Sequence, residues 1–136
     1  MGAQGIVPGL SAEASQMVTL DRTAAHVGSG SLRVFATPAM VLMIEEVCRK
    51  MVEPYLEAGQ STVGVSLKVR HLAPTPVGLN VRVRAEVAAF EDGVITFTAE
   101  AWDEVEKIGE AEHKRAVIEV DRFLQRVRRK AVGAAG

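Results

Sequence analysis

The sequence predicts an α+β domain in which one long helix is wrapped by a curved antiparallel β-sheet. The first observation is a helical pattern of apolar residues that begins at Thr37-Pro38 and ends near Pro54. The second is a run of four strand-like segments that follows it, joined by short polar turns. A helix that is apolar on more than one side needs a sheet that curves around it, because each apolar face must be buried.

The helix is expected to start at Thr37, which offers a hydroxyl at the N-cap position. Pro38 then stands at the first helical position, where a missing N–H costs nothing. Two apolar stripes follow at helical spacing, and they comprise Met40, Met43, Ile44, Val47 and Met51, and Val41, Cys48 and Val52. The residue before a proline avoids the helical region, so the helix should end near Pro54.

The strand-like segments cover about residues 63–71, 81–89, 94–102 and 108–120. In the first, apolar residues alternate strictly with other residues, which predicts a buried face that continues to His71. Another strand is expected at 17–25 and a short helix at 121–132. Residues 1–15 are rich in Gly, Ala and Ser and are expected to form a loosely ordered leader, which leaves 16–132 as a single domain.

Composition excludes several classes of function. Lys+Arg is 16 and Asp+Glu is 17, so the basic excess of a general nucleic-acid-binding protein is missing. The single cysteine, Cys48, fits a reducing compartment. With no recognisable signal peptide and no apolar run of about 20 residues, we expect a cytoplasmic protein without a membrane segment. No Cys and His spacing suggests a metal site, so we expect no bound metal. The sequence also has no glycine-rich phosphate loop and no Gly-x-Ser-x-Gly elbow.

Three polar residues are candidates for chemistry. Glu45 projects from an apolar stripe of the helix, where an unpaired carboxylate is unusual, although a structural ion pair or a groove edge would also explain it. His71 lies at the end of the buried face of its strand, where its ring could take part in proton transfer. The alternative is a structural core histidine that is hydrogen-bonded to the backbone. Thr37 is explained by capping alone, yet a helix N-terminus also offers free N–H groups that can hold an oxyanion.

The remaining charged residues have plainer interpretations. His26 and His113 are isolated, and His113 lies in a charged run that is typical of a surface or a sheet edge. The C-terminal helix is basic through Arg122, Arg126, Arg128, Arg129 and Lys130. A solvated basic face explains these residues, and attraction for the phosphates of coenzyme A is the functional alternative.

Several segments together resemble the fluoroacetyl-CoA thioesterase family of hot-dog-fold proteins. They are Phe35-Ala-Thr-Pro-Ala-Met-Val-Leu-Met-Ile-Glu45, Pro54-Tyr-Leu56, the strand from Gly64 to His71, and Arg115-Ala-Val-Ile118. The resemblance covers about residues 17–130. It implies a hot-dog fold, a homodimer and a site at the dimer interface; whether dimers pair further into a tetramer stays open.

By the same resemblance, Thr37, Glu45 and His71 match the reacting residues, and Phe35, Gly64 and Arg115 match substrate-binding positions. The implied activity is hydrolysis of a short-chain acyl-CoA, with no cofactor beyond the coenzyme A of the substrate. The fluoroacetyl-specific enzyme has a longer lid rich in Phe and Pro before this motif, whereas residues 26–34 here are short and glycine-rich. We therefore expect a more general acyl-CoA thioesterase.

Three other classes of function stay open. A hot-dog hydratase or dehydratase usually has an Asp and a His close together in sequence, and this pair is missing here. A non-catalytic acyl-CoA-binding module would not need the Thr, Glu and His together. An unrelated α+β protein that binds a small molecule is the third.

Overall fold

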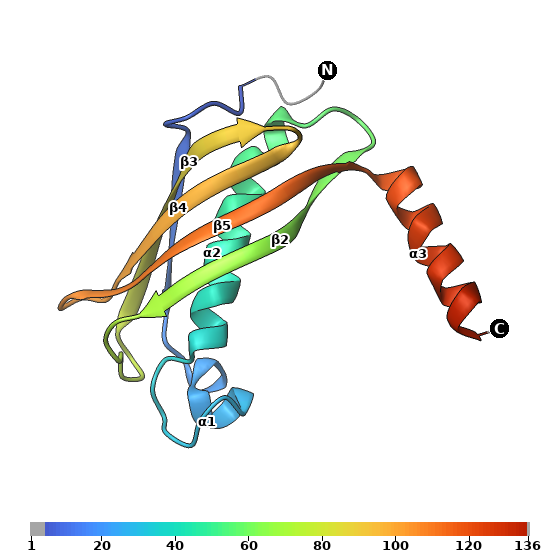
Figure 1. Ribbon diagram of the computed structural model, residues 1–136. Helices are drawn as coiled ribbons and strands as arrows, with labels where there is room; N and C mark the ends of the chain where they lie inside the picture. Colours follow the sequence, from blue (N-terminus) through green and yellow to red (C-terminus); the bar gives the residue numbers. More distant parts are fainter. Residues whose placement is uncertain (1–4, 136) are drawn as a thin grey trace.

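The structure, a computed structural model, describes residues 5–135 and consists of a five-stranded sheet around one long helix (Figure 1). The helix is α2 (Thr37–Val52). The strands are β1 (Ser11–Met17), β2 (Gln60–His71), β3 (Asn80–Glu91), β4 (Val94–Trp102) and β5 (Lys107–Glu119). Every neighbouring pair is antiparallel, in the order β1-β3-β4-β5-β2. The α+β prediction, with a curved antiparallel sheet around a central helix, is therefore confirmed.

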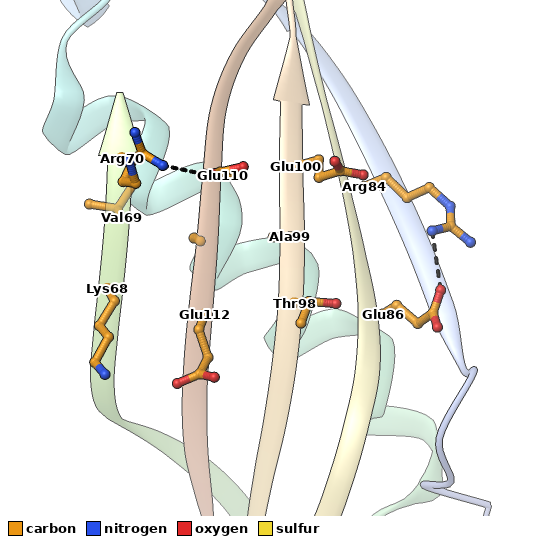
Figure 2. Close-up of a pocket in the computed structure, with 11 residues that line it drawn as sticks. Lys68, Val69, Arg70, Arg84, Glu86, Thr98, Ala99, Glu100, Glu110 and Glu112 are labelled. Atoms are coloured by element: carbon orange, nitrogen blue, oxygen red, sulfur yellow. Dashed lines mark hydrogen bonds and ion pairs between the residues drawn. The ribbon is translucent and has the colours of Figure 1, made fainter. Parts of the chain in front are cut away.

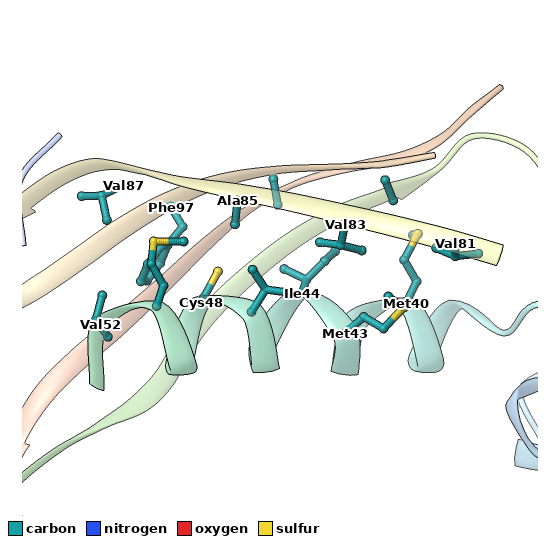
Figure 3. Close-up of a cluster of buried hydrophobic side chains, with 14 of the residues drawn as sticks. Met40, Met43, Ile44, Cys48, Val52, Val81, Val83, Ala85, Val87 and Phe97 are labelled. Atoms are coloured by element: carbon teal, nitrogen blue, oxygen red, sulfur yellow. The ribbon is translucent and has the colours of Figure 1, made fainter. Parts of the chain in front are cut away.

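The core lies between α2 and the concave face of the sheet (Figure 3). The buried residues of the helix are Met40, Met43, Ile44, Val47, Cys48, Met51 and Val52. On β3 and β4 the facing residues alternate along each strand, and they comprise Val81, Val83, Ala85, Val87, Ile95, Phe97, Ala99 and Ala101. Because both predicted stripes of α2 contribute to this core, the helix is fixed in rotation as well as in position.

The N-terminal part differs from its prediction. β1 begins at Ser11 and pairs with β3, so residues 11–15 are not a loose leader; residues 1–4 lie outside the described part. The expected strand at 17–25 is also wrong, because the chain turns into η1 (Leu20–Arg22) and α1 (Ala24–Val27). Backbone pairing with β3 holds β1, and the Thr23 hydroxyl caps α1. An apolar pattern reveals neither of these interactions.

The predicted strict alternation of β2 breaks at Val65. The register with β5 shifts between Gly64 and Ser66, which is a β-bulge, and the Val65 side chain is 54% exposed. One extra residue moves the inward face from even to odd numbers. Gly64 therefore faces the helix on one side of the bulge, and His71 faces it on the other.

The outer face of the sheet is covered by charged side chains (Figure 2). A shallow hollow of about 520 Å³ lies over the four strands β2 to β5. Ion pairs line it: Arg70 on β2 with Glu110 on β5 at 3.0 Å, and Arg84 with Glu86 along β3 at 3.3 Å. Such exposed pairs are typical of a solvated face, so the search for a site turns to the concave side.

Two helical segments complete the chain. η2 (Glu53–Tyr55) continues α2 through Pro54, close to the predicted end of the helix. α3 (Val120–Ala135) confirms the predicted C-terminal helix and projects away from the sheet beside the β2 edge (Figure 1). Among residues 5–135, no helix is long and apolar enough to cross a membrane.

Candidate active site

Two groups of polar side chains lie on the concave side of the sheet. The first, here called the threonine–histidine pair, comprises Thr37 and His71. The second, here called the arginine cluster, comprises Glu45, Thr62, His113 and Arg115. Together they include all three residues that the sequence marks as candidates for chemistry.

The threonine–histidine pair joins the start of α2 to the end of β2. Ala36 is the N-cap and Thr37 is the first helical residue, so the predicted capping role of Thr37 is wrong. Its hydroxyl is instead free to meet His71, and Oγ1 lies 2.7 Å from Nδ1. Pro38 has no N–H, so Thr37 and Ala39 are the first-turn residues of α2 whose N–H groups have no intrahelical acceptor. Thr37 is exposed, so a ligand can reach this helix end.

The His71 ring is held in a partly apolar place. Phe35 meets it edge to face, with ring centroids 6.4 Å apart. Burial lowers the pKa of His71 below its ordinary value, which favours the neutral imidazole at neutral pH. Its Nε2 is buried and has no hydrogen-bond partner within residues 5–135. A neutral ring with one unused nitrogen can accept or donate a proton.

The arginine cluster is organised around one buried guanidinium. Arg115 is 6% exposed, and it donates to Thr62 through Nε to Oγ1 at 2.9 Å and through Nη2 to the carbonyl at 3.1 Å. Its Nη1 lies 3.7 Å from Oε2 of Glu45. Burial lowers the pKa of Arg115 and the charge of Glu45 opposes this, but an arginine remains charged. The cluster therefore presents a fixed positive charge beside a carboxylate.

His113 contradicts its prediction as a surface or edge residue. The ring is 1% exposed and stacks on Phe97, with centroids 6.0 Å apart. Nδ1 donates to the carbonyl of Ser66 at 2.9 Å, so Nε2 must accept from Nη1 of Arg115 at 3.2 Å. Burial lowers the pKa of His113, partly opposed by the bond to Ser66, and the nearby Arg115 lowers it further.

The signal that was missed for His113 is the period of β5. His113 and Arg115 are two residues apart on this strand, so they share one face. The charged neighbours of His113 occupy the opposite face, which makes the segment look like a surface.

Gly64 keeps the space beside Glu45 open. A Cβ atom at this position would lie 3.0 Å from Oε2 of Glu45, 3.3 Å from His113 Cε1 and 3.5 Å from Nη1 of Arg115. The Glu45 side chain is 41% exposed, so its carboxylate is accessible. A small group can therefore approach the carboxylate over Gly64. Cys48 contributes no nucleophile, because burial raises the pKa of its thiol to about 12.

Within one chain the two groups stay apart. Phe35 and the threonine–histidine pair lie together, and Glu45 lies with Gly64 and Arg115. Thr37 and Glu45 are eight residues apart on α2, which is about 12 Å along the axis. Among residues 5–135, no three His, Cys, Asp or Glu side chains are grouped as a metal site would require.

Comparison with known proteins gives consistent matches. A sequence model of the family described as fluoroacetyl-CoA-specific thioesterase matches residues 18–121. The fluoroacetyl-CoA thioesterase of Streptantibioticus cattleyicolor is 41% identical over 97 residues, which cover 71% of this chain and 70% of that protein.

Solved structures agree with these sequence matches. A solved structure of a fluoroacetyl-CoA thioesterase superposes with a TM-score of 0.86 at 34% identity, covering 93% of this chain and 98% of that one. A thioesterase-superfamily protein from Thermus thermophilus gives 0.88 at 29% identity, covering 96% and 98%. A hot-dog-like protein from Thermanaerovibrio acidaminovorans gives 0.85 at 20% identity, covering 90% and 91%, which supports the fold alone.

Proposed function

The chain belongs to the fluoroacetyl-CoA-specific thioesterase family and is a thioester hydrolase, and from that premise we propose that it hydrolyses short-chain acyl-CoA to the free acid and coenzyme A. The observation that carries the proposal is the accessible carboxylate of Glu45, which stands beside the charge of Arg115 over the gap at Gly64. No cofactor is needed beyond the coenzyme A of the substrate. The substrate and the single cysteine fit a cytoplasmic protein.

We assign the chemical roles from this geometry. Glu45 either attacks the thioester carbonyl or removes a proton from the attacking water. Either route puts negative charge on the carbonyl oxygen, which the hydroxyl of Thr37 and the first amides of α2 stabilise. The C–S bond then breaks, and His71 assists proton transfer to the leaving coenzyme A thiolate. In the direct-attack route the acyl group remains on Glu45 as an anhydride, which water hydrolyses to the free acid and the Glu45 carboxylate.

We further propose that two copies complete the site. β2 is an edge strand of 12 residues, and its free side has no partner within the described part of the chain. A long open edge favours pairing with another strand. When two identical edges pair antiparallel, the assembly has two-fold symmetry, so the two ends of β2 lie opposite each other.

This pairing suits the positions of the two groups. Gly64 lies near one end of β2 and His71 at the other, and the bulge turns both toward the concave side. A two-fold axis between Leu67 and Lys68 would set Gly64 of one copy opposite His71 of its partner. The threonine–histidine pair of one chain would then serve the Glu45 of the other, which removes the separation of about 12 Å within one chain.

Thiol release from a panel of acyl-CoA thioesters tests the activity. We expect hydrolysis of acetyl-CoA and other short thioesters, and loss of most turnover in Glu45→Gln. Glu46→Gln is the matched control, because this neighbouring carboxylate lines a different groove with Lys50 and β1. Absence of release from every thioester by the folded wild-type protein would contradict the function and favour an acyl-CoA-binding module. Equal turnover in Glu45→Gln would remove Glu45 from the mechanism.

Mixing two inactive variants tests the shared site. Glu45→Gln and His71→Asn chains, unfolded and refolded together, form mixed dimers in which one site holds both intact residues only if the site spans two chains. We expect the mixture to regain up to about a quarter of the wild-type activity, since half of the dimers are mixed and each has one good site of two. A mixture that stays inactive would place the whole site within one chain.

Fluoroacetyl-CoA is expected to be hydrolysed without strong preference over acetyl-CoA. Residues 28–33 are exposed and hold no Phe, Tyr or Trp that could cover the acyl group. The ratio of kcat/KM for the two thioesters measures this selectivity. A ratio far above the one set by the chemical reactivity of the free thioesters would require another source of discrimination.

A further inference from the structure

α3 carries an excess of positive charge, and its basic side chains form no ion pair within residues 5–135. Its basic residues are Arg122, Arg126, Arg128, Arg129 and Lys130, against the single acid Asp121. Arg122, Arg126 and Arg129 are spaced four and three residues apart, so they lie on one side of the helix.

These three arginines line a groove of about 780 Å³, here called the arginine groove. Its other walls are the start of β2, the end of β5 and the β3–β4 hairpin. Phe90, Val117 and Phe123 supply its apolar part. The groove also contains two carboxylates, Asp92 and Glu119, and the amide of Gln60 donates to Glu119 at 3.2 Å. The three guanidinium groups of the groove therefore outnumber its two carboxylates, and one of these carboxylates already accepts a hydrogen bond from Gln60.

The arginine groove begins next to the arginine cluster on β5. Val117 follows Arg115 by two residues on β5, which is about 7 Å along the strand, and it pairs with Thr62, whose hydroxyl and carbonyl bind Arg115. From there the groove extends along α3, where Arg122 and Arg129 are about 10 Å apart along the axis. A long ligand that runs along β5 from Glu45 would have its far end near these arginines.

We propose that the arginine groove binds the nucleotide end of coenzyme A, an inference that rests on the proposed thioesterase function. Coenzyme A has its thiol at one end of an extended pantetheine arm and its diphosphate, 3′-phosphate and adenine at the other. Guanidinium groups bind phosphates through paired charge-assisted hydrogen bonds. Phe90 and Phe123 offer aromatic faces for the adenine. Phosphate affinity on a separate element lets the acyl pocket over Gly64 stay small.

The test compares two thioesters that share an acyl group. Acetyl-CoA carries the nucleotide, whereas S-acetyl-N-acetylcysteamine ends after the first part of the pantetheine arm. In the double variant Arg126→Gln/Arg129→Gln we expect KM for acetyl-CoA to rise roughly tenfold with kcat little changed. Its kcat/KM for the truncated thioester should stay at the wild-type value. Arg128→Gln is the matched control, because this arginine lies on α3 but does not line the groove.

Several outcomes would overturn the proposal. They are an unchanged KM for acetyl-CoA in the double variant, an equal loss with the truncated thioester, or the same rise in KM from Arg128→Gln. Calorimetric titration with coenzyme A itself separates this proposal from the thioesterase function. Suppose that the wild type hydrolyses no thioester yet binds coenzyme A, and that the double variant binds it roughly tenfold more weakly. The nucleotide site in the groove is then supported, and the proposed thioesterase function is contradicted. Equal affinity of the two proteins refutes the groove.

Discussion

Replacing His113 by Phe tests whether this buried ring holds Arg115 in place. A phenyl ring keeps the size and can still stack on Phe97, but it removes both ring nitrogens. Nη1 of Arg115 then loses a buried acceptor, and the carbonyl of Ser66 loses its donor. A buried polar group without a partner costs about 1–3 kcal/mol, and the more exposed Ser66 recovers a bond to water. We expect the free energy of unfolding to fall by about 2 kcal/mol.

The pH dependence of this loss has a definite sign. His113 titrates at 6.5 in its ordinary state, and burial lowers its pKa in the folded protein. The unfolded chain therefore binds more protons as the pH falls below 6.5, so this contribution to stability is present above 6.5 and is lost in acid. His113→Phe lacks the titrating ring. The difference in free energy of unfolding between wild type and His113→Phe should therefore be smaller at pH 5 than at pH 8. Urea unfolding followed by tryptophan fluorescence measures this difference.

The matched variant His113→Gln separates hydrogen bonding from stacking. A glutamine amide can donate to the carbonyl of Ser66 and accept from Arg115. We expect it to retain more stability than His113→Phe at pH 8, and to keep KM for acetyl-CoA nearer to wild type because Arg115 stays oriented. If the phenylalanine variant unfolds at the wild-type urea concentration, or if its deficit is the same at both pH values, the reasoning about the His113–Arg115 bond is refuted.

Other substitutions probe the core and the threonine–histidine pair. Gly109→Ala places a Cβ 2.6 Å from Sδ of Met40 and should cost about 1–3 kcal/mol in urea unfolding; no change would show that Met40 moves freely. Cys48 should resist iodoacetamide at pH 8 until the chain is unfolded, because burial raises its pKa to about 12, and rapid labelling of the native protein would contradict its burial. Thr37→Val removes the bond to His71 and should lower kcat roughly a hundredfold while the protein stays folded; unchanged kcat would exclude its hydroxyl from catalysis.

Periodicity predicts the elements of this fold where side chains are sorted by burial. The stripes of α2 and the alternation of β3 and β4 have this property, and the structure agrees with them. The side chains of β1 and of the turns after it are not sorted by burial in this way. Ser11–Met17 has no apolar face that marks it as a strand, and the pairing that forms it comes from β3, about seventy residues later in the chain. A contact at that separation leaves no local pattern.

The candidate site was predictable one residue at a time but not as an arrangement. Period and position indicate Glu45, His71 and Thr37. The resemblance adds Phe35, Gly64 and Arg115. The hydrogen bond between Thr37 and His71 depends on how the start of α2 meets the end of β2. His113 was assigned to the surface because its neighbours in sequence are charged, although every second residue of β5 faces the core.

The bulge at Val65 links the failed pattern to the geometry of the site. A regular strand that keeps His71 on the concave side would turn Gly64 outward, because seven residues separate them and seven is odd. The extra residue corrects this parity, so the gap at Gly64 opens toward Glu45 while His71 still meets Thr37. Leu67 also stays inward, opposite His113, and the carbonyl of Ser66 beside the bulge accepts the proton of that ring. The bulge that breaks the alternation in the sequence thus lets one strand contribute residues to both the threonine–histidine pair and the arginine cluster.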